Sequence, residues 1–107
     1  MNVFLKFGSR ESELERVQAV IADALNLKFD ARESSYWGGD YFLARLDGGI
    51  AKSIKVHLNV DVYSNEPIFP EFAEYRVLIH CDHVAEEDLL ISALRELGLE
   101  PIDRSSI

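Results

Sequence analysis

One stretch of this chain constrains its fold more than any other, because side chains alternate between apolar and polar over residues 53–63. Successive side chains of a β-strand point to opposite faces of a sheet, so the pattern predicts one long, half-buried strand. The apolar face, which must be covered, consists of Ile54, Val56, Leu58, Val60 and Val62. The other face is expected to stay in water or to meet a partner, and it consists of Ser53, Lys55, His57, Asn59, Asp61 and Tyr63.

Two amphipathic helices are the segments able to cover that apolar face. The first is predicted over about residues 10–26, where Ser12 and Glu15 have the spacing of a capping box at its start. The second is predicted over about residues 85–97, with acids in its first turn and Gly98 as its stop signal.

The remaining regular segments are expected to be strands, and Val77 to Ile79 is apolar enough to be buried on both faces beside the 53–63 strand. These strands are predicted over about residues 2–7, 27–33, 41–46, 75–81 and 99–104, with a hairpin turn at Asp47-Gly48-Gly49. The fold class is therefore α+β: a single domain over residues 1–107 with the order β-α-β-β-β-β-α-β. Both helices should pack on one face of a mainly antiparallel sheet, leaving the other face open. The expected core contains Val56, Leu58, Val60, Val77 and Ile79 from the sheet and Leu14, Ile21, Leu90 and Leu94 from the helices.

The formal net charge of -8 is concentrated in the second part of the chain. Between residues 61 and 88 the one base is Arg76, against Asp61, Glu66, Glu71, Glu74, Asp82, Glu86, Glu87 and Asp88. This balance favours cationic partners and makes direct nucleic-acid binding improbable. An acidic surface also simply keeps proteins in solution. A nucleic-acid mimic would need carboxylates at phosphate-like spacing, and no such regular spacing is evident.

The sequence predicts a cytoplasmic protein without a membrane span. It has no apolar run of about 18 residues and no signal-peptide pattern at its start. The one cysteine, Cys81, has no partner for an internal disulfide, which fits a reducing compartment.

Catalytic and metal-binding motifs are weak, so we expect no enzyme, no metal and no cofactor. The run from His80 to His83 groups two imidazoles, a thiol and a carboxylate, but neighbours on a strand point to opposite faces. Asp82 is better explained as the cap of the second helix. Cys81 has no recognisable base or oxyanion hole, and no phosphate-binding loop occurs.

Aromatic and acidic residues instead give two segments the character of a protein-binding surface. One surrounds the Gly38-Gly39 turn, and the other is the proline-containing loop that carries Phe69 and Phe72. The residues expected to bind a partner are Tyr36, Trp37, Asp61, Glu66, Glu71 and Glu74. The alternative reading is structural, with Trp37, Phe69 and Phe72 anchoring their loops to the core.

Several short motifs resemble small bacterial immunity proteins of polymorphic toxin systems, such as those of contact-dependent growth inhibition. They are Gly38 to Phe42, Asn65 to Pro67, Phe69 to Phe72 and the apolar run Val77 to Ile79. The resemblance implies a cytosolic protein that binds and neutralises a cognate toxin encoded by a neighbouring gene. A basic nuclease as the toxin would agree with the acidic charge of this chain.

The alternative function is a small-ligand or regulatory domain with a pocket between sheet and helices. Such a domain needs a concave apolar cavity of about 300 Å³ or more, whereas an immunity protein needs a specific exposed surface.

Overall fold

The computed structural model describes residues 2–46 and 49–107 and confirms the predicted order of elements. Asp47 and Gly48 of the predicted hairpin turn lie outside the described residues. Two short 3-10 helices, η1 (Ser35–Trp37) and η2 (Pro70–Phe72), lie in the connections. The main elements are β1 (Val3–Ser9), α1 (Leu14–Leu25), β2 (Asp30–Ser34), β3 (Gly39–Arg45), β4 (Ser53–Leu58), β5 (Val77–Asp82), α2 (Glu87–Glu96) and β6 (Glu100–Ser106).

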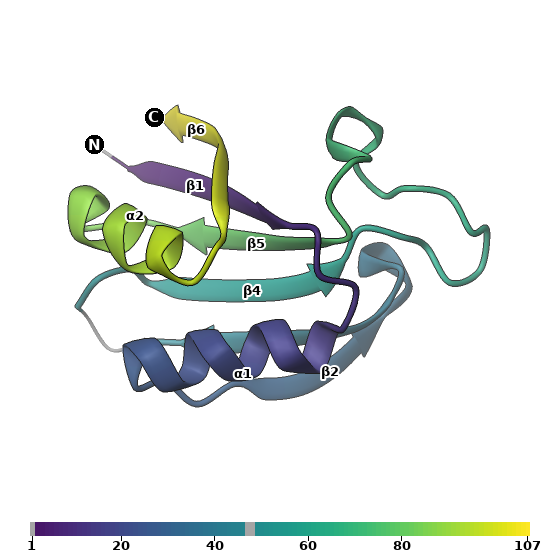
Figure 1. The fold of residues 1–107 in the computed structure, drawn as a ribbon, viewed down its shortest axis with the longest axis horizontal. Helices are drawn as coiled ribbons and strands as arrows, with labels where there is room; N and C mark the ends of the chain where they lie inside the picture. Colours follow the sequence, from purple (N-terminus) through teal and green to yellow (C-terminus); the bar gives the residue numbers. More distant parts are fainter. Residues whose placement is uncertain (1, 47–48) are drawn as a thin grey trace.

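The strands form one 6-stranded sheet in the order β2-β3-β4-β5-β1-β6, and each neighbouring pair is antiparallel. Both helices cover the same face of this sheet (Figure 1). The two-layer α+β architecture is therefore confirmed. Neither of the described helices is long and apolar enough to cross a membrane.

The core lies between the helices and the central strands. Val77, Leu78 and Ile79 of β5 are fully buried, as expected for a strand covered on both faces. The side chains of the core come from alternate strand positions and from one stripe of each helix: Val3, Leu5, Phe7, Ile54, Val56, Val77, Ile79, Val17, Ile21, Leu90 and Leu94. The expected core residues Leu14, Leu58 and Val60 are only half-buried. The helix α1 begins at Leu14, several residues later than predicted, and so leaves the end of the sheet that carries Leu58 and Val60 uncovered.

The long strand that the alternating pattern predicts is too long by several residues. β4 ends at Leu58, and the next backbone amide, that of Asn59, donates to the Arg76 carbonyl just before β5 begins. Beyond this point the backbone bonds to turns instead, since the amide of Asp61 donates to the Glu66 carbonyl and the amide of Val62 to the Gly38 carbonyl. Val62 and Tyr63 are consequently exposed, at 61% and 71%.

Two predicted helix caps are wrong. α1 begins after Glu13 without a side-chain cap, so Ser12 and Glu15 form no capping box. α2 begins at Glu87, whereas Asp82 is the last residue of β5 and accepts a hydrogen bond from Ser53 at 3.3 Å. The predicted stop at Gly98 is confirmed by its left-handed φ of 86°.

Candidate functional site

The sheet face away from the helices is not open at its centre, contrary to the prediction. Trp37 at the end of η1 and Phe69 in the β4–β5 loop cover it, with ring centroids 5.0 Å and 5.9 Å from that of His57. His57 is fully buried and His80 is 9% exposed. The polar face of β4 therefore carries a small aromatic core of its own.

The two imidazoles of this core satisfy each other. Their Nε2 atoms lie 2.8 Å apart, and Nδ1 of His57 lies 2.8 Å from the Leu58 carbonyl oxygen. Because a carbonyl only accepts, His57 carries its proton on Nδ1, and His80 donates from Nε2. Burial lowers the pKa of His57 to about 4 and the pKa of His80 to about 3. Both histidines are thus neutral structural groups near pH 7.

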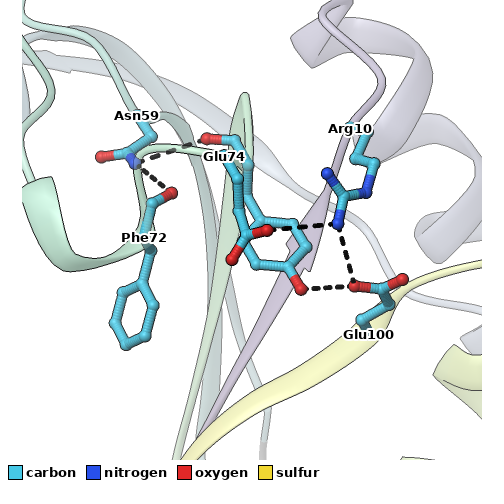
Figure 2. A network of polar contacts seen from close by, with 6 residues as sticks. Arg10, Asn59, Phe72, Glu74 and Glu100 are labelled. Carbon is cyan, nitrogen blue, oxygen red and sulfur yellow. Dashed lines mark hydrogen bonds and ion pairs between the residues drawn. The ribbon is translucent and has the colours of Figure 1, made fainter.

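Asn59 holds the β4–β5 loop against this core. Its side-chain oxygen accepts from the amide of Phe69 at 2.8 Å, and its Nδ2 donates to the carbonyls of Phe69, Phe72 and Tyr75 at 3.2, 2.9 and 3.4 Å. Figure 2 shows Asn59 beside the Phe72 carbonyl. This buried amide replaces the strand pairing that β4 loses at its end.

A second set of contacts fixes the far end of the loop. Figure 2 shows Arg10 between Glu74 and Glu100, with Nη2 3.3 Å and 4.0 Å from their carboxylate oxygens. The Tyr75 hydroxyl donates to Glu100, and this bond raises the pKa of Tyr75. The ring of Tyr75 packs so closely on Gly8 that an added Cβ there would lie 2.5 Å from it. The loop is therefore anchored at both ends.

On the helix side of the sheet, the late start of α1 leaves a groove of about 730 Å³. Its apolar lining comes from α1, β2, β3, β4 and the loop after β4: Leu14, Ala31, Phe42, Leu58, Val60 and Val62. Its charged lining consists of the acids Glu13, Glu15, Glu33 and Asp40 and the base Arg32. All of these charged residues are exposed. The groove thus combines an apolar floor with a predominantly acidic rim.

Exposed apolar side chains continue the groove at one end. Val62, which lines it, is joined to the Gly38 turn by a 3.0 Å hydrogen bond from its amide to the Gly38 carbonyl. Tyr63 follows Val62, and Tyr36 precedes the turn with 79% of its surface exposed. Exposed large side chains gathered beside an apolar groove are typical of an interaction surface.

Four of the six predicted partner-binding residues lie at or beside one end of the groove, and the other two, Glu71 and Glu74, lie further along the loop. Tyr36 and Trp37 lie at the groove end, and Trp37 both lines the groove and covers the histidines. Asp61 and Glu66 belong to the adjoining turn, where the amide of Asp61 donates to the Glu66 carbonyl at 2.8 Å. The Gly38-Gly39 turn lies beside this acidic turn, because the amide of Val62 donates to the Gly38 carbonyl. Glu71 is exposed in η2, and Glu74 is held by Arg10 near β6.

The acids of the groove rim were missed in the sequence. Glu15 is predicted to belong to a capping box, and Glu13 and Glu33 are not singled out as binding residues by any pattern. No charge excess marks the segment before α1, where Lys6 and Arg10 balance Glu11 and Glu13. The fold brings these carboxylates to one rim, because the start of α1 and residues of β2, β3 and β4 line the same groove.

The run from His80 to His83 is dispersed by the strand. His80 faces the aromatic core, Cys81 is fully buried on the helix side, and exposed His83 packs against Phe4 with ring centroids 4.9 Å apart. Burial raises the pKa of the Cys81 thiol far above its usual range, which suits a core residue. Among residues 2–46 and 49–107, no group of three or more potential ligands could hold a metal ion.

Comparison with known proteins adds no family assignment: no protein-family model matches the chain, and no curated protein matches it significantly. The groove, the exposed aromatic residues and the motif resemblance are therefore the features that bear on function.

Proposed function

We propose that this protein is an immunity protein that binds a basic toxin domain through the acidic-rimmed groove and thereby neutralises it in the cytosol. The observation that carries the proposal is the groove itself, in which apolar side chains lie beneath Glu13, Glu15, Glu33 and Asp40. In this role the protein performs no catalysis, needs no cofactor and makes no direct contact with nucleic acid.

Two kinds of side chain in the groove contribute to binding in different ways. Burial of apolar surface on Leu14, Phe42 and Leu58 contributes affinity. The carboxylates of the rim raise the association rate of a cationic partner and orient it. A segment of a basic protein that carries apolar residues between lysines or arginines matches both features.

The motif resemblance supports a toxin as the partner. Gly38 to Phe42 forms the turn and the strand start at one end of the groove, and Asn65 to Phe72 belongs to the loop that adjoins this turn. These motifs are therefore at or beside the candidate interface, whereas the remaining part of the resemblance, Val77 to Ile79, is buried in β5. Many basic toxins are nucleases, and an acidic inhibitor can occupy the surface with which such an enzyme holds its substrate.

The size of the groove also favours the alternative function, because 730 Å³ exceeds the roughly 300 Å³ that a small-ligand pocket requires. A metabolite site usually encloses its ligand and directs a few polar groups toward it. Here the polar groups are exposed carboxylates on a rim that is open to water. This geometry favours a protein segment over an enclosed metabolite.

Co-expression tests the proposal. The chain is produced with the product of the adjacent upstream gene, and the mixture is purified through a tag on that product. We expect a stoichiometric complex and survival of cells that die when the product is expressed alone. A toxic neighbour that neither binds the chain nor is neutralised by it would refute the proposal.

A further inference from the structure

A second concavity, of about 540 Å³, lies on the sheet face away from the helices and has the opposite charge. Its lining includes Arg32, Arg45, Lys52 and Lys55, with Asp82 as the one acid. The pocket therefore has an excess of three positive charges in a chain of net charge -8. Arg32 and Tyr41 line both this pocket and the groove, but the proposed recognition of a basic partner uses neither the other cations of the pocket nor Asp82.

The register of the sheet brings these cations together. Arg45 pairs with Ser53, and Leu43 pairs with Lys55, in the ladder between β3 and β4. Side chains at these alternate positions share one face, so Arg45 and Lys55 point to the same side. Arg32 of β2 lies opposite Tyr41, on the same face of the next strand pair.

The four cations have few counter-charges. Among the described residues, none of them forms an ion pair within 4.0 Å. The Asp82 carboxylate, the one acid of the lining, accepts a hydrogen bond from Ser53 at 3.3 Å. Positive charges gathered in a concave surface raise the local concentration of small anions.

Lys55 is the most constrained of the four. Its ammonium group lies 3.8 Å from the ring centroid of Trp37, and its side chain is half-buried. Burial lowers the pKa of Lys55, and the partial compensation comes from Asp82. A bound anion would stabilise the charged form of this amine. Binding of an anion would therefore offset the effect of burial on Lys55.

We propose that this pocket binds a small molecule that carries two linked phosphoryl groups. A diphosphate has about three negative charges at neutral pH, which match the excess of positive charge. The guanidinium groups of Arg32 and Arg45 suit phosphate oxygens because they donate paired hydrogen bonds. Tyr41, which is half-buried, lines the same pocket and offers part of its ring to an organic group attached to the diphosphate. A long polyanion would extend onto the acidic surface and is disfavoured there.

Calorimetric titration of the full chain at low salt tests this inference. The probes are inorganic pyrophosphate, inorganic phosphate and ADP, with the fluorescence of Trp37 as a second readout because Lys55 contacts its ring. We expect pyrophosphate to bind about tenfold or more tightly than phosphate, a difference of about 1.4 kcal/mol. Tighter binding of ADP than of pyrophosphate would identify an organic diphosphate as the preferred ligand. Absence of binding by pyrophosphate and by ADP at millimolar concentration would overturn the proposal.

Paired variants distinguish a built site from general attraction. R45Q/K52Q removes two exposed cations of the pocket and should weaken pyrophosphate binding about tenfold or more. R16Q/K28Q makes the same charge change at exposed positions outside the pocket and should change affinity less than about twofold. D82N, which removes the one acid, should strengthen binding. Equal weakening by both double variants would show that net charge alone attracts the anion, and the proposal would be wrong.

Discussion

The Nε2 atoms of His57 and His80 lie 2.8 Å apart beneath the indole of Trp37. This contact joins the two central strands on the face that carries no helix. It depends on both imidazoles remaining neutral, because only a neutral His57 offers a lone pair to the proton of His80. Lys55 and Lys6 are the positively charged side chains near the pair; Lys55 disfavours protonation of both imidazoles, and Lys6 disfavours protonation of His80. No carboxylate contributes to the lowered pKa values.

The first prediction is a loss of stability in mild acid. The folded-state pKa values of about 4 and about 3 lie below the ordinary histidine value of 6.5. The unfolded chain therefore binds protons first as the pH falls. The free energy of unfolding should level off above about pH 7.5 and should fall by about 1.4 kcal/mol per pH unit for each imidazole between pH 6 and 5. Urea denaturation at pH 7.5, 6 and 5 measures this slope. His83→Gln, at an exposed position, should leave it unchanged, and equal stability at pH 7.5 and 5 would contradict the buried neutral pair.

The second prediction concerns the loop anchor. Asn59→Ala should lower the free energy of unfolding by about 1–3 kcal/mol, because it leaves the Phe69 amide and the bonded carbonyls without their partner. Asn59→Asp should be at least as harmful, since a carboxylate oxygen would face the carbonyls that now accept from the amide. Denaturation and limited proteolysis of the 60–75 segment check both variants. Ser64→Ala, in the same loop, is the control, and resistance of the Asn59 variants equal to that of the control would show that the loop is anchored elsewhere.

The third prediction separates the core from the groove floor. Ile54→Ala removes a fully buried side chain and should cost about 2–5 kcal/mol. Leu58→Ala, two residues further along β4, should cost clearly less because Leu58 is half-buried and lines the groove. Denaturant midpoints of the two variants make the comparison. A larger loss at Leu58 than at Ile54 would mean that the groove is closed in solution.

The sequence predicted the helix side of the sheet better than the other side. Ile54 and Val56 are buried as their alternation required, because the helices that cover them are themselves visible as periodic patterns. His57 and Asn59 obey the same alternation but are buried too. The side chains that cover them, Trp37 and Phe69, belong to irregular segments. The course of such segments cannot be predicted from sequence periodicity.

The candidate site was predictable only in part for a related reason. Tyr36 and Trp37 were predicted because aromatic residues beside a glycine turn stand out in the sequence, and Trp37 lines the groove. Glu13 and Glu33 were not found, since each is an ordinary exposed acid in the sequence and only the fold brings the two to the same groove. The length of α1 was overestimated by several residues at its start, and the groove is the space left by that missing turn.

The fourth prediction addresses charge steering by the acidic loop. E66Q/E71Q/E74Q should slow association with a cognate basic toxin several-fold and reduce its salt dependence, with a smaller effect on dissociation. Stability should change by less than about 1 kcal/mol, because the Arg10–Glu74 pair is exposed. Stopped-flow or surface-based kinetics measure both rates. The control is E86Q/D88N/E96Q at exposed positions around α2. Equal slowing by the two triple variants would attribute the steering to net charge rather than to the loop.

The most direct test of the groove as the toxin-binding surface is the affinity of Ala31→Arg for the cognate toxin. Ala31 is exposed and lines the groove, so an arginine there places a long cation among the rim acids without disturbing the core. Ala19→Arg makes the same change on the exposed surface of α1, away from the groove lining. We predict that Ala31→Arg lowers affinity at least about 100-fold, or about 2.7 kcal/mol, while Ala19→Arg retains affinity within about threefold and both variants melt like the parent. Full affinity of the Ala31→Arg variant would contradict the account, because it would place the toxin-binding surface outside the groove.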